Sequence, residues 1–274
     1  MDATVTTLSP RQTFDDNMRP AQLLLQVYRL LDSSDVIITE GNMVTALRQL
    51  VGAAGDEELM LIYNEVFLGL VRESAQMARS HLRHAALCNL LRQSVVASCT
   101  ALETYLPTLL RTNLPLMIRA RGRDAVTKGD LDLGAQFRDL KFSLDEALRV
   151  MTEPHPEEFI STKILGMINF SYLSGNRGVA VAGKLLGLVD PWGAIAARLQ
   201  GDTDVLQKTV KDTIERRNDI VHRADRRQND PGGHQQPIAY SWTKQAVDTI
   251  DHVCTALDEL VTMRVAEISA MITG

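Results

Sequence analysis

The sequence predicts an all-α protein, and three observations support this prediction. Aromatic residues make up only 5% of the 274 residues, while Leu, Ala, Val and Met are plentiful. That composition suits helix-on-helix packing better than a sandwich or barrel, whose strands favour aromatic and β-branched residues. Apolar residues recur at three- and four-residue steps along several segments, and no segment shows the alternating pattern of a strand. We therefore expect a helical bundle.

The first part of the chain divides into a tail and a helical region. Residues 1–19 are expected to form a flexible N-terminal tail. After Pro20 the apolar spacing becomes helical, and residues 20–83 are predicted to form an N-terminal helical region with further helices near 40–54 and from Glu57 onward. The apolar residues that carry the first of these helices are Leu23, Leu24, Val27, Leu30 and Leu31.

Residues 84–274 are predicted to form the main helical bundle, which contains an inserted region at about 113–200. Its most regular helix spans about 84–112, with Pro107 as an expected kink, and residues 113–136 are interpreted as an irregular connector because of their Pro and Gly content. Further helices are expected at about 137–151, 156–172, 179–188, just after Asp190, 204–222 and 242–271.

Composition also indicates where the protein resides and what it does not bind. The N-terminal sequence lacks the basic start and apolar stretch of a signal peptide, and no apolar run is expected to span a bilayer. We therefore predict a cytoplasmic protein without a membrane partner. Cys88, Cys99 and Cys254 are far apart and are expected to be buried free thiols. His81 and His84 are expected on the surface, so neither a metal nor a cofactor is predicted.

Positive charge is concentrated in two places, although the chain as a whole carries −5. Residues 216–227 contain five Arg against two Asp, and residues 111–128 contain four Arg and one Lys against one Asp. Two basic patches on an acidic body suit a localised nucleic-acid site. Two solvated helix ends would produce the same pattern, and both interpretations remain open.

The best functional lead is the segment Arg217-Asn-Asp-Ile-Val-His222, at the end of the predicted helix 204–222. At about 100° per residue, Arg217 falls inside the apolar stripe of that helix. The stripe comprises Leu206, Val210, Ile214, Ile220 and Val221. A charged guanidinium there needs a buried partner or an interface. His222 lies about 140° from Arg217 around the helix, so the two converge only if the helix end unwinds or a two-fold axis brings two copies together.

These residue types suit RNA cleavage without a metal. His222 can exchange protons with a ribose 2′-hydroxyl or with the leaving oxygen. Arg217 can bind phosphate through its planar fork and stabilise the charge that develops on it. Asn218 can orient a phosphate oxygen or the imidazole ring.

The segment from Arg217 to Asp225, followed by a polar loop and a last long helix, resembles the HEPN family. The family carries Arg, four to six residues, then His, often with a polar residue directly after the Arg, as Asn218 is here. Residues 94–106 resemble the family's first core helix, in which Glu103 is similar to the polar residue that faces the motif and is a candidate partner for Arg217. The resemblance covers about residues 84–272.

Membership of this family implies a helical bundle that dimerises, with two motifs lining a shared cleft. Many members are toxins or antiviral effectors that cut RNA, so the resemblance implies RNA, a second copy of the chain and an antitoxin or regulatory protein as partners. The predicted catalytic residues are Arg217, Asn218 and His222, with Glu103 in support. The predicted RNA-backbone contacts are Arg216, Arg223, Arg226, Arg227, Arg119, Arg121 and Arg123.

Two other functions remain open at this point. One is a non-catalytic HEPN module that binds nucleotide, RNA or a partner protein. The other is a helical adaptor in which Arg217 is only a member of a buried ion pair.

Overall fold

A computed structural model describes residues 8–32, 84–122, 124–127, 140–168, 173–230 and 232–273. These residues form helices joined by turns and loops, and no strand occurs among them. The predicted all-α class is therefore confirmed. The helices predicted near 40–54 and from Glu57, like most of the region 20–83, lie outside the described residues.

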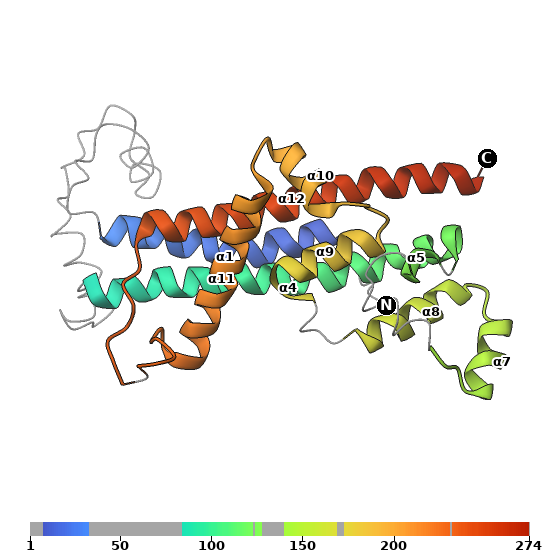
Figure 1. Ribbon diagram of the computed structural model, residues 1–274, viewed down its shortest axis with the longest axis horizontal. Coiled ribbons are helices and arrows are strands. Elements are labelled where there is room, and N and C mark those ends of the chain that lie inside the picture. The colour runs from blue at the N-terminus through green and yellow to red at the C-terminus, as the bar shows by residue number, and fades with distance from the viewer. Residues whose placement is uncertain are drawn as a thin grey trace, which may run out of the picture.

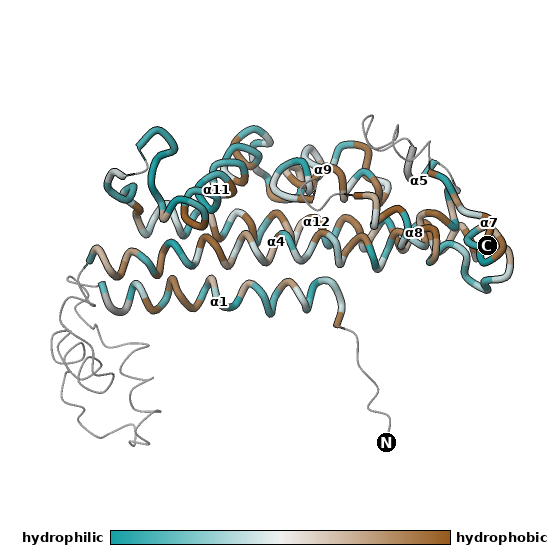
Figure 2. Tube along the Cα trace, turned by 90° about the horizontal axis from the view of Figure 1, so that it is seen from below, coloured by the Kyte–Doolittle hydropathy of each residue, from teal (hydrophilic) through white to brown (hydrophobic). Residues whose placement is uncertain are grey.

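Three long helices lie side by side and form the body of the molecule (Figure 1). They are α1 (Pro10–Leu31), α4 (His84–Arg121) and α12 (Tyr240–Thr273). A fourth helix, α11 (Thr203–Arg223), crosses α4 and α12 steeply. Figure 2 shows α1 on one side of α4, with α9 and α11 on the opposite side. The helix that carries the Arg-His motif is thus packed on the outside of the long-helix layer.

Helix α1 begins at Pro10 and not after Pro20, so the predicted tail 1–19 is wrong for residues 10–19. Ser9 caps the helix: its hydroxyl accepts from the Gln12 amide at 3.1 Å, and the Gln12 side chain accepts from the Ser9 amide at 3.0 Å. Pro10 occupies the first turn, where its missing N–H costs nothing. Pro20 lies on the exposed face of the helix. The predicted boundary at Pro20 is therefore wrong, and the N-cap Ser9 lies eleven residues earlier.

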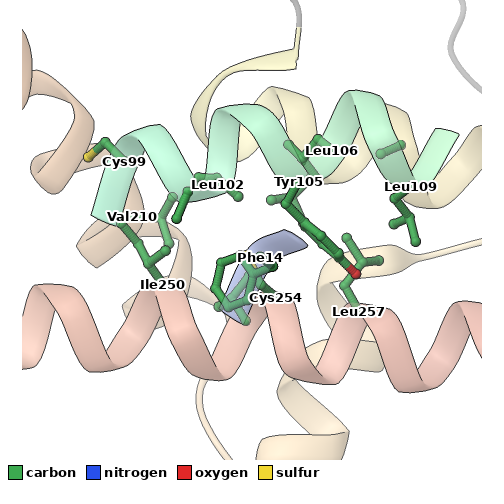
Figure 3. Packing of buried hydrophobic residues seen from close by; sticks show 14 of the residues in the cluster. Phe14, Cys99, Leu102, Tyr105, Leu106, Leu109, Val210, Ile250, Cys254 and Leu257 are labelled. Atoms are coloured by element: carbon green, nitrogen blue, oxygen red, sulfur yellow. The ribbon is translucent and has the colours of Figure 1, made fainter. Parts of the chain in front are cut away.

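The core joins α1, α4 and α12 (Figure 3). Tyr105 of α4 is fully buried, and its ring packs edge-on against Phe14 of α1 at a centroid distance of 5.3 Å. The Tyr105 hydroxyl donates to Asp258 of α12 at 3.0 Å, which satisfies a polar group that would otherwise be costly to bury. Since Phe14 belongs to this core, α1 is part of the same bundle as residues 84–273.

The predicted insert at 113–200 is also built into the bundle. Helix α4 continues through Pro115 to Arg121, so the irregular connector expected at 113–136 is wrong for residues 113–121. Most of residues 122–136 lie outside the described part of the chain. The described residues between 124 and 199 then form a series of shorter helices. They are α5 (Asp124–Thr127), α7 (Leu144–Thr152), α8 (Pro156–Met167), α9 (Gly175–Leu185) and α10 (Pro191–Leu199). Helices α8 and α9 pack on α4, and α10 packs on α12.

Among the described residues, α4 is long and apolar enough to cross a membrane. The expectation that no such run exists is therefore too strong. However, 56% of the apolar window is buried inside the bundle, which also fits the core helix of a soluble protein.

Candidate functional site

Helix α11 presents one narrow face to the bundle. The Asp202 side chain caps its start by accepting from the Val205 amide at 3.0 Å. Val210, Thr213 and Ile220 are buried, whereas Val221 is 52% exposed. The contact line therefore runs 210, 213, 217 and 220, at helical three- and four-residue steps. Including Val221 in the buried stripe was wrong, because that residue faces away from the helices on which α11 rests.

Arg217 lies on this contact line and forms an ion pair with Glu103 of α4. The two side chains are 17% and 31% exposed, respectively. Arg217 Nη1 also donates to Asn218 Oδ1 at 3.1 Å, and the Ser174 hydroxyl donates to Glu103 Oε1 at 2.7 Å. The partnership suggested by the sequence between Glu103 and Arg217 is thus present, and residues from α4, α11 and the segment before α9 meet there.

The Cys99 thiol lies one turn before Glu103, next to the same guanidinium. Burial raises the pKa of Cys99 to about 12, against the opposing effect of Arg217. The thiol donates to the Thr213 carbonyl at 3.9 Å. Cys99 is therefore a protonated packing residue beneath the site.

His222 lies near the end of α11 with an exposed side chain. Arg217 is half-buried against Glu103, so the two predicted catalytic groups point in different directions, as the helical geometry requires. Within one chain, no unwinding of the helix brings them together, because α11 stays helical through Arg223.

A second charged cluster lies just beyond His222, and sequence reasoning missed it. Asp225 is fully buried and accepts from Arg92 Nε at 2.6 Å and from Arg216 Nη2 at 3.0 Å. Arg216 Nε lies 2.7 Å from the other carboxylate oxygen. Ala224 and Asp225 both have positive φ, +49° and +63°. This left-handed ending turns the carboxylate back under α11.

Arg216 therefore has a different role from the predicted RNA contact. Besides Asp225, its Nη2 donates to the carbonyls of Gln236 and Pro237 at 3.2 and 3.0 Å, and its guanidinium lies 5.8 Å from the Trp242 ring centroid. The sequence signal for this cluster was Arg92, a lone charge within an apolar helix, which is buried only when paired.

The other arginines of the 216–227 patch are partly neutralised. Arg223 pairs with Asp219 one turn earlier, and Arg226 Nε donates to the Gly233 carbonyl at 2.8 Å. Arg227 is exposed. The patch is a set of local pairs more than a free polycation, with its accessible positive charge at the helix end and in the following loop.

The second basic patch lies elsewhere in the molecule. Arg119 is 16 residues after Glu103 on α4, which corresponds to a rise of about 24 Å. Arg119 is exposed beside α8, and Arg121 packs next to Gly187. Within one chain these two residues do not share a site with Arg217, contrary to the predicted grouping. Arg123 and His81 lie outside the described residues.

Among the described residues no group of three His, Cys, Asp or Glu side chains is arranged to hold a metal ion. No protein-family model, no curated protein and no solved structure matches the chain.

Proposed function

We propose that this protein is a metal-independent endoribonuclease that acts as a homodimer, with Arg217, Asn218 and His222 as its catalytic residues. The observation that carries the proposal is the pairing of a half-buried Arg217 with Glu103, five residues before an exposed His222 on the same helix. Positioned phosphate binding and proton transfer are the two functions that RNA cleavage needs.

In the proposed reaction the ribose 2′-hydroxyl attacks the adjacent phosphorus. The new P–O bond forms as the bond to the 5′-oxygen breaks, which leaves a 2′,3′-cyclic phosphate and a 5′-hydroxyl. His222 accepts the 2′-hydroxyl proton, and the leaving 5′-oxygen takes a proton from the imidazolium of the same His222 or of His222 in the second copy. Arg217 and Asn218 stabilise the charge on the phosphate oxygens.

A dimer is part of the proposal because Arg217 and His222 diverge around α11. A two-fold axis beside α11 would place His222 of one copy opposite Arg217 of the other. Arg217 Nε is buried and has no hydrogen-bond partner among the described residues. An oxygen from RNA or from the second copy would relieve the cost of that unpaired donor. Resemblance to HEPN toxins and defence effectors further suggests a cytoplasmic protein controlled by an antitoxin or another regulatory protein.

The test is RNA cleavage in EDTA, with analysis of the product ends and measurement of mass in solution. We expect the wild type to produce cyclic phosphate ends, and His222→Ala to lower the rate by about 10²-fold or more. His252→Ala, which removes an exposed histidine from α12, is the matched control. Cleavage that survives His222→Ala or that comes from a monomer would contradict the proposal.

A non-catalytic binding module is the second candidate, and one observation favours it. Donors of Arg217 are already committed to Glu103 and Asn218, so a phosphate must compete with a resident carboxylate. Tight RNA binding with no cleavage over long incubation would support this function. An adaptor in which Arg217 is only structural predicts instead that Arg217→Ala lowers the melting temperature and leaves RNA affinity unchanged.

A further inference from the structure

The junction between α1 and α4 holds a thiol, an imidazole and a carboxylate in one hydrogen-bonded row. Cys88 Sγ lies 3.6 Å from His84 Nε2, and His84 Nδ1 lies 2.9 Å from Asp32 Oδ1. Cys88 and His84 are one turn apart on α4, and Asp32 caps the end of α1. The row comes from two helices and is independent of the α11 motif.

The row fixes the protonation of the ring. A carboxylate only accepts hydrogen bonds, so Asp32 selects the tautomer in which His84 Nδ1 carries the proton. Nε2 is then left as an acceptor facing the Cys88 thiol. The other oxygen of Asp32 accepts from the Tyr28 hydroxyl, and the Tyr28 ring stacks on Tyr240 at a centroid distance of 6.0 Å. Asp32 is therefore held in place by a buried tyrosine.

Cys88 differs from Cys99 and Cys254 because it has a histidine beside its thiol. Burial raises the pKa of the Cys88 thiol, against the opposing effect of Arg92, so at neutral pH it needs a base to become a nucleophile. Burial also raises the pKa of Cys99 and of Cys254. Of the three thiols, however, only that of Cys88 is hydrogen-bonded to His84.

The row opens onto a cleft of about 640 Å³ between the start of α4 and residues 226 and 232–238. His84, Cys88, Arg92, Arg226 and His234 line it. Arg92 shares the carboxylate of Asp225 with Arg216, so that cluster keeps an excess positive charge. The Arg226 guanidinium has a carbonyl for a partner, which leaves its charge uncompensated by that contact. The cleft therefore favours an anionic ligand.

We propose that Cys88 is a nucleophilic thiol served by His84 and Asp32, and that the cleft admits an anionic acyl thioester. His84 Nε2 takes the thiol proton as Cys88 Sγ attacks the carbonyl carbon. The carbonyl–sulfur bond of the donor breaks, and the departing thiolate takes the proton from His84. One thioester replaces another, so the step needs no oxidant and no further reactant.

The first test measures alkylation of the native full-length protein by iodoacetamide and by iodoacetate, with each cysteine followed by mass spectrometry. We expect Cys88 to react at least about tenfold faster than Cys99 or Cys254, and His84→Gln or Asp32→Asn to remove most of that advantage. His155→Gln is the matched control, since His155 is also an exposed histidine beside a carboxylate. Melting temperatures identify any variant that has lost its fold.

The charge of the cleft is tested by the ratio of the two reagents. Relative to free cysteine, the wild type should favour iodoacetate, and Arg226→Gln should lower that preference several-fold while iodoacetamide labelling stays unchanged. Equal labelling of all three cysteines, or rates that are unchanged in both His84→Gln and Asp32→Asn, would overturn the nucleophile.

The acyl step is tested with the succinyl thioester of N-acetylcysteamine. We expect a succinyl adduct on Cys88 that hydroxylamine removes. Alkylation of Cys88 without acylation would overturn the thioester assignment. RNA cleavage is measured on the same Asp32→Asn and His84→Gln samples, and no change is expected, because the thiol row does not rest on the proposed ribonuclease function.

Discussion

Arg216 and Arg217 are adjacent in sequence, yet they belong to two regions with different physical character. Arg216 joins Arg92 around a fully buried Asp225, so two guanidinium groups share one carboxylate away from water. Arg217 pairs one-to-one with Glu103 at a site that solvent partly reaches. Removing the Asp225 carboxylate would leave two guanidinium groups without an anion. The Arg217 guanidinium, in contrast, lies where a ligand can reach it. Burial and the ratio of charges, more than residue type, separate a structural cluster from a candidate site.

The largest expected effect is on Asp225. Asp225→Ala should lower the free energy of unfolding by about 3–5 kcal/mol, because it leaves two guanidinium groups facing each other without an anion. Denaturant unfolding followed by circular dichroism measures this. Asp230→Ala is the control, because it removes an exposed carboxylate from the loop that follows α11. A loss below about 1 kcal/mol would show that water reaches the cluster, and the contrast between the two regions would disappear.

An intermediate effect is expected at the Glu103–Arg217 pair. A double-mutant cycle with Glu103→Ala and Arg217→Ala should give a coupling energy of about 1–2 kcal/mol, within the range measured for residues in contact. Urea unfolding of the wild type, the two single variants and the double variant measures this coupling energy. Coupling as large as the loss at Asp225 would make Arg217 a structural residue and would favour the adaptor function.

The smallest effect is expected for a pair of the same chemistry on the surface. Arg198 Nε lies 2.7 Å from Glu259, with side chains that are 56% and 45% exposed. Arg198→Ala should change the melting temperature little, because exposed pairs contribute at most about 1 kcal/mol. A loss comparable to that of Arg217→Ala would mean that exposure does not rank these three ion pairs.

The predictable parts of the fold were those carried by periodic spacing. The predicted starts of helices α4, α11 and α12 agree with the structure within a few residues. A long apolar stripe repeats the helical spacing many times, so one ambiguous residue does not change the prediction. The start of helix α1 is predicted too late because Pro20 resembles a break, although Ser9-Pro10-Arg11-Gln12 already has the residue types of a capping box with Pro in the first turn. Val221 is wrongly predicted to lie in the buried stripe. The angular position of a residue around its own helix does not show which neighbouring helices will cover it.

The candidate sites divide in the same way. Sequence identified Arg217, Asn218 and His222 as neighbours on one helix and suggested Glu103 as a partner. It grouped Arg119 and Arg121 with them because local charge carries no information on distance along a straight helix. It did not find Arg92 with Asp225, or Cys88 with His84 and Asp32, since two left-handed residues and the α1–α4 junction create these contacts.

By itself the sequence determined the all-α class, the amphipathic helices and a motif whose residue types suit phosphate chemistry. Helical period and composition are local properties, so they can be read without neighbours. Only the tertiary structure decided which charges are shared, which are exposed and which thiol has a base beside it. Those properties depend on groups brought together from distant parts of the chain, and the cost of leaving a charge or a polar group without a partner arises only when packing removes water.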